Sequence, residues 1–258
     1  MPRSARVDVG NEIYHIINRA NGRLKIFNKD EDFQLFEQLL YDTKELFDMR
    51  ILAYCLMPNH FHLVLYPKND GDMGKFMHRL SNSHTRKVHA ITNTNGSGHL
   101  YQGRYKSFLV DKENYIIAVI KYVERNSVRA KLTRLCQNWQ WGSAWRRTKG
   151  TIEQKKLLDQ KSFKLPDNYL SWINTEDNSE TTNIIRRSVK KGIPYGRDKW
   201  IDNMVSKYHL ESTLKSQGRP DNAMLKLADD TIIATNDRDL RKRLKALGRK
   251  TIYLKSKK

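Results

Sequence analysis

Two β-rich runs joined by a very short turn constrain most strongly how this chain can fold. Residues 50–57 (RILAYCLM) and 60–66 (HFHLVLY) are separated only by Pro58 and Asn59. Proline and asparagine favour tight turns, and so short a connection holds two successive strands side by side and antiparallel. We therefore predict a tight antiparallel hairpin over residues 50–66.

The segments around this hairpin alternate between strand and helix patterns. Residues 12–19 alternate loosely between apolar and polar and predict a strand, whereas residues 30–48 and 72–89 repeat apolar residues at helical spacing. A further strand is expected near 104–110, and a helix over 112–126. This β-α-β-β-α-β order followed by a helix is that of a ferredoxin-like α+β sandwich. We expect helices to cover its antiparallel sheet on one side and leave the other face open for a site.

The charge of the chain is strongly positive. There are 48 lysines and arginines against 28 aspartates and glutamates, which gives a formal net charge of +20. Such a surplus attracts a polyanion and releases its counterions on binding, so nucleic acid is the leading partner. The alternative is that the charge only keeps the protein soluble, although +20 exceeds the roughly 2–8 units that a small domain needs for this.

The remaining composition excludes several classes of protein. Cys55 and Cys136 are the only cysteines and belong to no CxxC pair, which argues against a disulfide framework or a zinc ribbon. No run approaches the roughly 18 apolar residues of a membrane helix, and the N-terminus lacks the apolar centre of a secretory signal. We therefore expect a folded, cytoplasmic protein that does not act at a membrane.

The basic residues are distributed unevenly along the chain. Residues 1–150 carry 24 basic and 14 acidic side chains, residues 151–237 carry 14 and 13, and residues 238–258 carry 10 and 1. Leucines at helical spacing in the last segment allow either a helix that clamps phosphates or a solvated tail. From charge, composition and helical patterns we predict a domain at 1–149, a linker at 150–166, a small, mainly helical C-terminal extension at 167–220 and a basic tail at 221–258.

A second concentration of cations lies in residues 121–149, where eight lysines and arginines stand against Glu124 alone. Three tryptophans are interleaved with them. Rings among cations suit single-stranded nucleic acid, because bases stack on the rings while phosphates pair with the charges. The alternative, which we favour for at least two of the three tryptophans, is that they close a hydrophobic core. Candidate DNA-binding residues in this region are Lys121, Arg125 and Arg129.

Two positively charged side chains on the last predicted strand are also candidates for DNA contact. Arg104 and Lys106 are two residues apart, so both point to one face of a strand. We expect at least one of them to contact a phosphate. The alternative is an exposed position at the edge of the sheet.

A histidine pair and a tyrosine provide candidate chemistry. His60 and His62 are two apart on a predicted strand, so both imidazoles project from one face and can share a divalent ion. Tyr122 and Asn126 lie one helical turn apart; if that side faces the sheet, Asn126 can complete the ion's ligands and Tyr122 stands beside it. A tyrosine there can attack a phosphodiester that the ion polarises. Imidazole and amide ligands suit Mg²⁺ or Mn²⁺, and the nitrogens prefer Mn²⁺. From spacing alone, surface histidines and a core tyrosine are the open alternatives.

Three motifs carry a resemblance to known proteins. They are residues 56–64 (LMPNHFHLV), 99–106 (HLYQGRYK) and 122–130 (YVERNSVRA). Together they resemble the single-tyrosine transposases of the HUH superfamily, and most closely the REP-associated tyrosine transposases, over residues 1–147. The resemblance implies a HUH fold that binds its ion through the histidine pair and Asn126 and uses Tyr122 as nucleophile. It also implies cleavage of single-stranded DNA at hairpins, with the strand retained as a 5′-phosphotyrosine.

The chain departs from the family pattern at two places. The family commonly has Asn-Pro-Val-Arg where this chain has Asn126-Ser127-Val128-Arg129, so we expect Asn126 to be held less rigidly. Residues 221–258 continue beyond the usual ending.

From the resemblance we expect a metal-dependent DNA endonuclease and strand transferase, associated with the nucleoid, as a monomer or homodimer. The alternatives are a catalytically silent DNA-binding regulator on the same fold and an RNA-binding factor.

Overall fold

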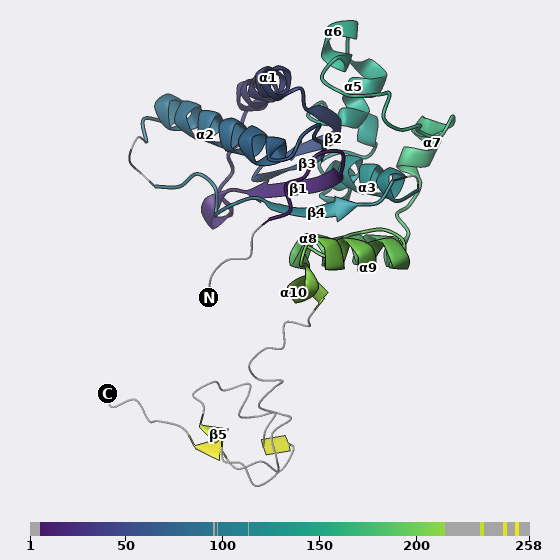
Figure 1. Cartoon of the computed structure of the whole chain (residues 1–258). Coiled ribbons are helices and arrows are strands. Elements are labelled where there is room, and N and C mark those ends of the chain that lie inside the picture. Colours follow the sequence, from purple (N-terminus) through teal and green to yellow (C-terminus); the bar gives the residue numbers. More distant parts are fainter. Residues whose placement is uncertain are drawn as a thin grey trace. The chain divides into compact units, whose positions relative to one another are not determined.

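Four antiparallel strands form the main sheet of the computed structural model shown in Figure 1. The structure describes residues 6–214, except 95, 97 and 113, together with residues 233–234, 245–246 and 251–252. The spatial order β2-β3-β1-β4, with antiparallel pairing throughout, is that of a ferredoxin-like α+β sandwich. The predicted hairpin and fold class are confirmed. The strands are β1 (Ile13–Arg19), β2 (Arg50–Met57), β3 (His60–Tyr66) and β4 (Lys106–Val110).

Helices α1 (Asp30–Phe47) and α2 (Asp72–Thr92) cover one face of this sheet (Figure 1). Sheet residues such as Ile16 and Leu63 pack against apolar side chains of both helices in one continuous core. The start of α1 is fixed by Asp32, whose carboxylate accepts hydrogen bonds from backbone N–H groups just before the helix, at 2.8 and 3.2 Å. Those groups would otherwise have no partner, so the contact defines where the helix begins.

Helix α3 (Asn114–Glu124) covers the opposite face, so the prediction that one face stays open is wrong. Val119 of α3 packs in one core with Val64 and Phe108 of the sheet. Ile185 of α8 (Ser179–Lys191) joins the same core. The part that α8 takes in this cover was not predictable from local patterns, because α8 contacts strands that lie far away in the sequence.

The other helices are short and lie mainly in the C-terminal part of the chain. None of the helices in the described part combines the length and apolar character that a membrane crossing demands. They are η1 (Asn21–Arg23), α4 (Asn126–Arg129), η2 (Cys136–Asn138), α5 (Ser143–Lys149), α6 (Ile152–Lys155), α7 (Tyr169–Asn174), α9 (Asp198–Lys207) and α10 (Glu211–Leu214).

The segment predicted as a linker at 150–166 packs onto the sheet. Leu157 and Leu158 are buried, and the backbone N–H of Asp159 donates to the carbonyl of Ile51 at 2.8 Å. The lysines of this segment stay at the surface, whereas burial of its leucines lowers the free energy of the folded chain.

Met1–Leu210 forms one compact unit, which includes the predicted linker, and Glu211–Lys258 forms another. Most of the predicted basic tail lies outside the described residues; within it, β5 (Ile233–Ala234) pairs in parallel with β6 (Thr251–Ile252).

Segments outside the four strands bond to both edges of the sheet. At β2, the backbone N–H of Leu56 donates to the carbonyl of Trp141 at 2.9 Å, in addition to the contact of Asp159. At β4, Tyr195 donates its N–H to Leu109 and accepts one from Asp111, each at 2.8 Å. These backbone bonds hold the C-terminal extension against the end of β4.

The tryptophans of the basic region serve mainly the core, as we favoured. Trp141 is buried, and Trp139 packs against the same cluster. The indole N–H of Trp139 donates to the carbonyl of Leu56 at 2.9 Å, which satisfies its polar atom inside the protein. These two rings are therefore engaged with the domain itself.

His84 on α2 is a buried imidazole whose ionisation should affect stability. Its Nδ1 lies 2.7 Å from the hydroxyl of Tyr101, and its ring lies near Phe27 with centroids 5.4 Å apart. Burial lowers the pKa of His84 from 6.5 to about 3. Between these two pKa values the imidazole is protonated in the unfolded chain and neutral in the folded chain. Its contribution to the free energy of unfolding is therefore highest above pH 6.5 and falls as the pH decreases toward 3.

We expect His84→Leu to reduce this acid sensitivity. The slope of unfolding free energy against pH between about pH 6 and 4 should decrease by about 1.4 kcal/mol per pH unit, because leucine does not titrate. Urea unfolding at several pH values measures the slope. His99→Leu, which removes an exposed imidazole, is the matched control. An unchanged slope in His84→Leu would contradict the assignment.

Candidate active site

Strand β3 presents His60 and His62 on one face of the sheet. Their ring centroids are 5.1 Å apart. In the register with β1, His60 lies opposite Arg19 and His62 opposite Ile17, and directly paired residues share a face. Val64, the next residue on this face, belongs to the core under α3. The histidine pair therefore lies on the same side of the sheet as the tyrosine helix.

Hydrogen bonds at Nδ1 orient both rings. Nδ1 of His60 donates to Oδ1 of Asn59 at 2.6 Å, because an amide oxygen only accepts, and this leaves the lone pair of His60 on Nε2. Nδ1 of His62 lies 2.9 Å from Nε2 of His15, which is fully buried on β1. When His62 is the donor in that contact, its Nε2 also carries a lone pair. Partners of this kind commonly fix metal-binding histidines.

Burial keeps these imidazoles neutral. It lowers the pKa of His15 to about 3. Burial, with the charge of Arg19 adding to it, lowers the pKa of His60 to about 4, and burial holds the pKa of His62 well below 6.5. At neutral pH all three rings therefore lack a positive charge. A neutral imidazole is the form that can bind an ion.

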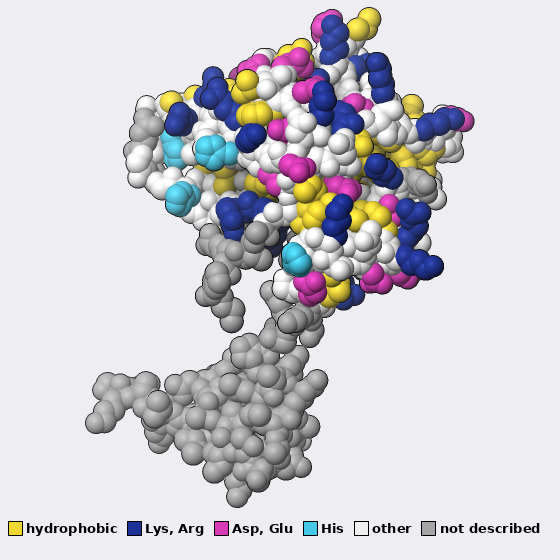
Figure 2. Space-filling model, viewed as in Figure 1, with side chains coloured by type: hydrophobic (Ala, Val, Ile, Leu, Met, Phe, Trp, Pro, Cys, Tyr) yellow, Lys and Arg dark blue, Asp and Glu magenta, His cyan; other side chains and the backbone are white. Residues whose placement is uncertain are grey.

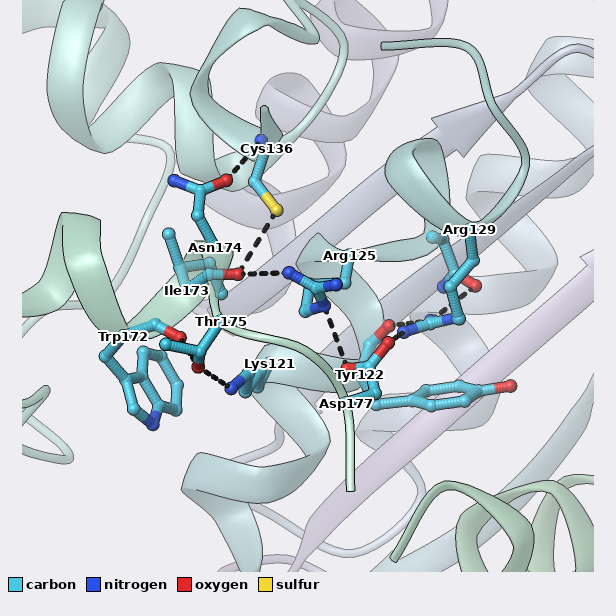
Figure 3. A network of polar contacts seen from close by, with 11 residues as sticks. Lys121, Tyr122, Arg125, Arg129, Cys136, Trp172, Ile173, Asn174, Thr175 and Asp177 are labelled. Atoms are coloured by element: carbon cyan, nitrogen blue, oxygen red, sulfur yellow. Dashed lines mark hydrogen bonds and ion pairs between the residues drawn. The ribbon is translucent and has the colours of Figure 1, made fainter. Parts of the chain in front are cut away.

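Helix α3 places Tyr122 beside the histidine pair. The ring centroid of Tyr122 lies 6.2 Å from that of His62 and 6.1 Å from that of His15, and both contacts are edge-on. Tyr122 is 8% exposed. Figure 3 shows its phenol extending away from the polar contacts around Asp177, with the hydroxyl at the far end. Tyr122, the candidate nucleophile, thus lies next to the strand that carries the histidines.

Asn126 begins α4, the short helix after α3. Its Oδ1 accepts a hydrogen bond from Nη2 of Arg129 at 2.8 Å, while its Nδ2 is buried without a partner in the described part of the chain. An amide oxygen has two lone pairs, so one stays available to a cation. Arg129 thus contacts this amide, and the looser hold expected without the family's proline stays a prediction.

The chemistry of these side chains fits a divalent cation. Two imidazole nitrogens and one amide oxygen leave open coordination positions of the kind that Mn²⁺ or Mg²⁺ fills with water or phosphate oxygens. Within the described residues, no group of three or more His, Cys, Asp and Glu side chains is suited to hold a metal. His60, His62 and Asn126 stay the predicted ligands of such an ion.

Three of the candidate DNA-binding residues have partners inside the chain (Figure 3). The ammonium of Lys121 donates to the hydroxyl of Thr175 at 2.6 Å. Arg125 and Arg129 both form ion pairs with Asp177, at 2.9 and 3.0 Å. Their charges are thus engaged by the C-terminal extension, which local sequence patterns did not indicate.

Arg104 and Lys106 instead line an open groove of about 410 Å³ beside the histidine pair. Arg19 and Lys190 add two more cations, and no acidic residue lines the groove. Lys106 lies opposite Ile17, which in turn lies opposite His62, so the groove and the histidines share one sheet face. Arg19 and Lys190 were missed in the sequence, because strand register and the position of α8 cannot be deduced from spacing.

Basic side chains are also distributed elsewhere on the surface. Figure 2 shows lysines and arginines over the whole visible face, with aspartates and glutamates between them. What distinguishes the groove is therefore the lack of acidic neighbours in its lining. An anionic strand would meet little repulsion there.

Comparison with known proteins gives a family match and structural neighbours. The family described as "Transposase IS200 like" matches residues 8–126, a range that includes all four candidate site residues. A solved REP-associated tyrosine transposase bound to a REP hairpin is 16% identical, with a TM-score of 0.49, and the match covers 64% of this chain and 99% of that chain. A protein of Deinococcus radiodurans R1 described as a candidate transposase is 18% identical, with a TM-score of 0.35 and coverage of 51% and 92%. No curated protein matches the chain. Residues 8–126, somewhat less than half of this chain, thus match the model of the IS200-like transposase family, as the three sequence motifs predicted.

Proposed function

We propose that this transposase-like protein cuts single-stranded DNA at hairpin repeats through a covalent 5′-phosphotyrosine on Tyr122 and can rejoin the strand. The observation that carries the proposal is the approach of Tyr122 to His62, with ring centroids 6.2 Å apart. The two residues come from a helix and a strand that are distant in the sequence. Their proximity places a candidate nucleophile next to a candidate ion-binding pair.

The proposed reaction is a transesterification at phosphorus. The hydroxyl oxygen of Tyr122 forms a bond to phosphorus, the bond to the 3′ oxygen breaks, and the proton lost by the phenol is balanced by the one that the leaving 3′ oxygen gains. An ion held by the histidine pair and Asn126 supplies Lewis-acid polarisation of the phosphate. Because one phosphoester replaces another, the 3′ hydroxyl can reverse the step and reseal the strand.

The groove beside the histidines is the proposed path of the DNA backbone. Its four cations, from β1, the residues around β4 and α8, lie on the same sheet face as the reacting groups. Phosphates in this groove would lead the strand to Tyr122. The sequence resemblance supports a hairpin next to the cleavage position. The single-stranded nucleotides beside the hairpin would then lie at the open coordination positions of the ion.

Adduct formation tests the proposal directly. Wild-type protein is incubated with Mn²⁺ or Mg²⁺ and hairpin oligonucleotides labelled at either end, including hairpins found near the protein's own gene. We expect a protease-sensitive covalent adduct that retains the 3′-labelled fragment and releases the 5′-labelled fragment with a free hydroxyl. Absence of an adduct on every structured strand, with Mn²⁺ binding verified, would support a silent DNA-binding regulator instead. Tighter binding to RNA of equal sequence would favour an RNA-binding factor.

Neutralising the groove is expected to weaken binding through electrostatics. The double variant Arg104→Gln, Lys106→Gln should reduce the slope of log affinity against log salt by about 1 for each phosphate that the groove no longer neutralises. Fluorescence anisotropy with a labelled hairpin at several salt concentrations measures the slope. Lys68→Gln is the control, because this exposed lysine pairs with Asp48 outside the groove. The same slope for the double variant and wild type would remove the groove from the DNA path.

A further inference from the structure

The C-terminal extension contacts the tyrosine helix and the residues after it through the end of α7 and the residues that follow α7 (Figure 3). The carbonyl of Ile173 accepts a hydrogen bond from Nη1 of Arg125 at 2.9 Å, and the hydroxyl of Thr175 accepts one from Lys121 at 2.6 Å. We call residues 173–177 the clasp. Its contacts fall on Lys121, Arg125 and Arg129, which lie before and after Tyr122 in the chain, although the two segments are about fifty positions apart.

Asp177 is the charged residue through which the clasp contacts two arginines. Its Oδ2 lies 3.0 Å from Nη1 of Arg129, and its Oδ1 lies 2.9 Å from Nε of Arg125. The side chains of Asp177 and Arg129 are each 17% exposed, and that of Arg125 is 8% exposed. Cations this far removed from water need a paired anion. Asp177 supplies that charge to both arginines at once.

Arg129 connects this carboxylate to the active site. Its Nη2 donates to the backbone carbonyl of Tyr122 and to Oδ1 of Asn126, and its guanidinium carbon lies 4.3 Å from the centroid of the Tyr122 ring. A guanidinium is planar and carries its N–H groups in a fixed fork. When Asp177 fixes one side of the fork, the orientation of the other side is fixed as well.

We propose that Asp177 is a positioning residue of the active site, which orients Arg129 and thereby holds the Tyr122 phenol and the Asn126 amide toward the histidine pair. The inference rests on the proposed function, because it concerns the geometry of that reaction. It gives the extension a part in the chemistry through the tyrosine helix rather than through DNA. It also gives Arg125 and Arg129 an internal role in place of phosphate contact.

Asp177→Asn in the full chain tests this role, because it keeps the size of the side chain and removes its charge. At saturating hairpin and Mn²⁺, we expect the single-turnover rate of adduct formation to fall about 10-fold or more, since small misplacements of reacting groups are costly. Hairpin affinity in EDTA should stay within about twofold. Asp177→Glu, which retains the charge, should recover part of the rate. A loss of rate without loss of affinity separates positioning from DNA binding.

Arg197→Gln is the matched control. It breaks another ion pair between the extension and the domain, the 2.8 Å contact with Asp111, and leaves the contacts of Arg129 in place. Hydrogen exchange over residues 114–129 adds a readout that needs no activity, and it should be faster in Asp177→Asn but not in Arg197→Gln. A wild-type rate in Asp177→Asn, or equal losses in both variants, overturns the inference. If wild-type protein forms no adduct, the proposed function fails, and the exchange comparison alone decides the inference.

Discussion

Tyr122→Phe is expected to lower covalent adduct formation on hairpin DNA by a factor of at least about 10³, to the background of the assay. The change removes only the oxygen that would bond to phosphorus, and no neighbouring group supplies an equivalent nucleophile in the same position. The ring itself is retained, so its contacts with His15 and His62 and its stacking under Arg129 should persist. Hairpin affinity should therefore stay within about twofold. Gel analysis of the adduct and anisotropy of the same labelled hairpin give the two quantities.

Tyr115→Phe is the control for this prediction. Tyr115 lies on the same helix, but its ring contacts Tyr195 of the extension instead of the histidine pair. This variant should form the adduct at the wild-type rate. Adduct formation by Tyr122→Phe at more than a few per cent of the wild-type rate would show that another residue is the nucleophile.

Loss of one candidate ion ligand is expected to have the second largest effect. His60→Ala removes a half-buried imidazole whose Nδ1 is already bonded to Asn59 and whose Nε2 is the atom available to an ion. Adduct formation at limiting Mn²⁺ should fall by about 10²-fold or more, because polarisation of the phosphate contributes several kcal/mol to such reactions. Calorimetric titration should show Mn²⁺ affinity reduced by about 10-fold or more. High Mn²⁺ should restore part of the rate.

The control here is His78→Ala, since His78 is exposed on α2 and bonds to Asn82 in its own helix. It should bind Mn²⁺ as wild type does. Hairpin binding in EDTA should be equal in all three proteins, because the basic groove is unaltered. Wild-type Mn²⁺ affinity in His60→Ala would place the ion elsewhere.

Local sequence patterns predicted the sheet and the common face of the two histidines for definite physical reasons, whereas the place of Tyr122 beside them was expected from the resemblance. The turn at Pro58 and Asn59 allows only one pairing of the flanking strands, and two-residue spacing fixes the common face of His60 and His62. The apolar side of α3 packs on a sheet face, and Tyr122 lies on that side of the helix. Each of these steps depends on neighbours in sequence or on a short turn.

The parts that could not be predicted depend on contacts between distant segments. His15 lies 47 residues from His62 and meets it only through the pairing of β1 with β3. Asp177 lies 48 residues from Arg129 in a region whose composition is nearly neutral. Basic residues before and after Tyr122 therefore looked like DNA contacts, although a single carboxylate from the extension engages two of them. Nothing in spacing or periodicity reports such a pairing.

The backbone bonds at the two borders of the sheet affect how copies of this protein can associate. Trp141 and Asp159 occupy hydrogen-bonding groups along β2, and Tyr195 occupies those at the end of β4. Exposed strand borders are the usual template for adding a strand from a neighbouring molecule. Because loops of the same chain already satisfy these groups, a continuous intermolecular sheet would first require them to detach. Self-association at β2 or at the end of β4 should therefore proceed through side-chain surfaces rather than by strand addition.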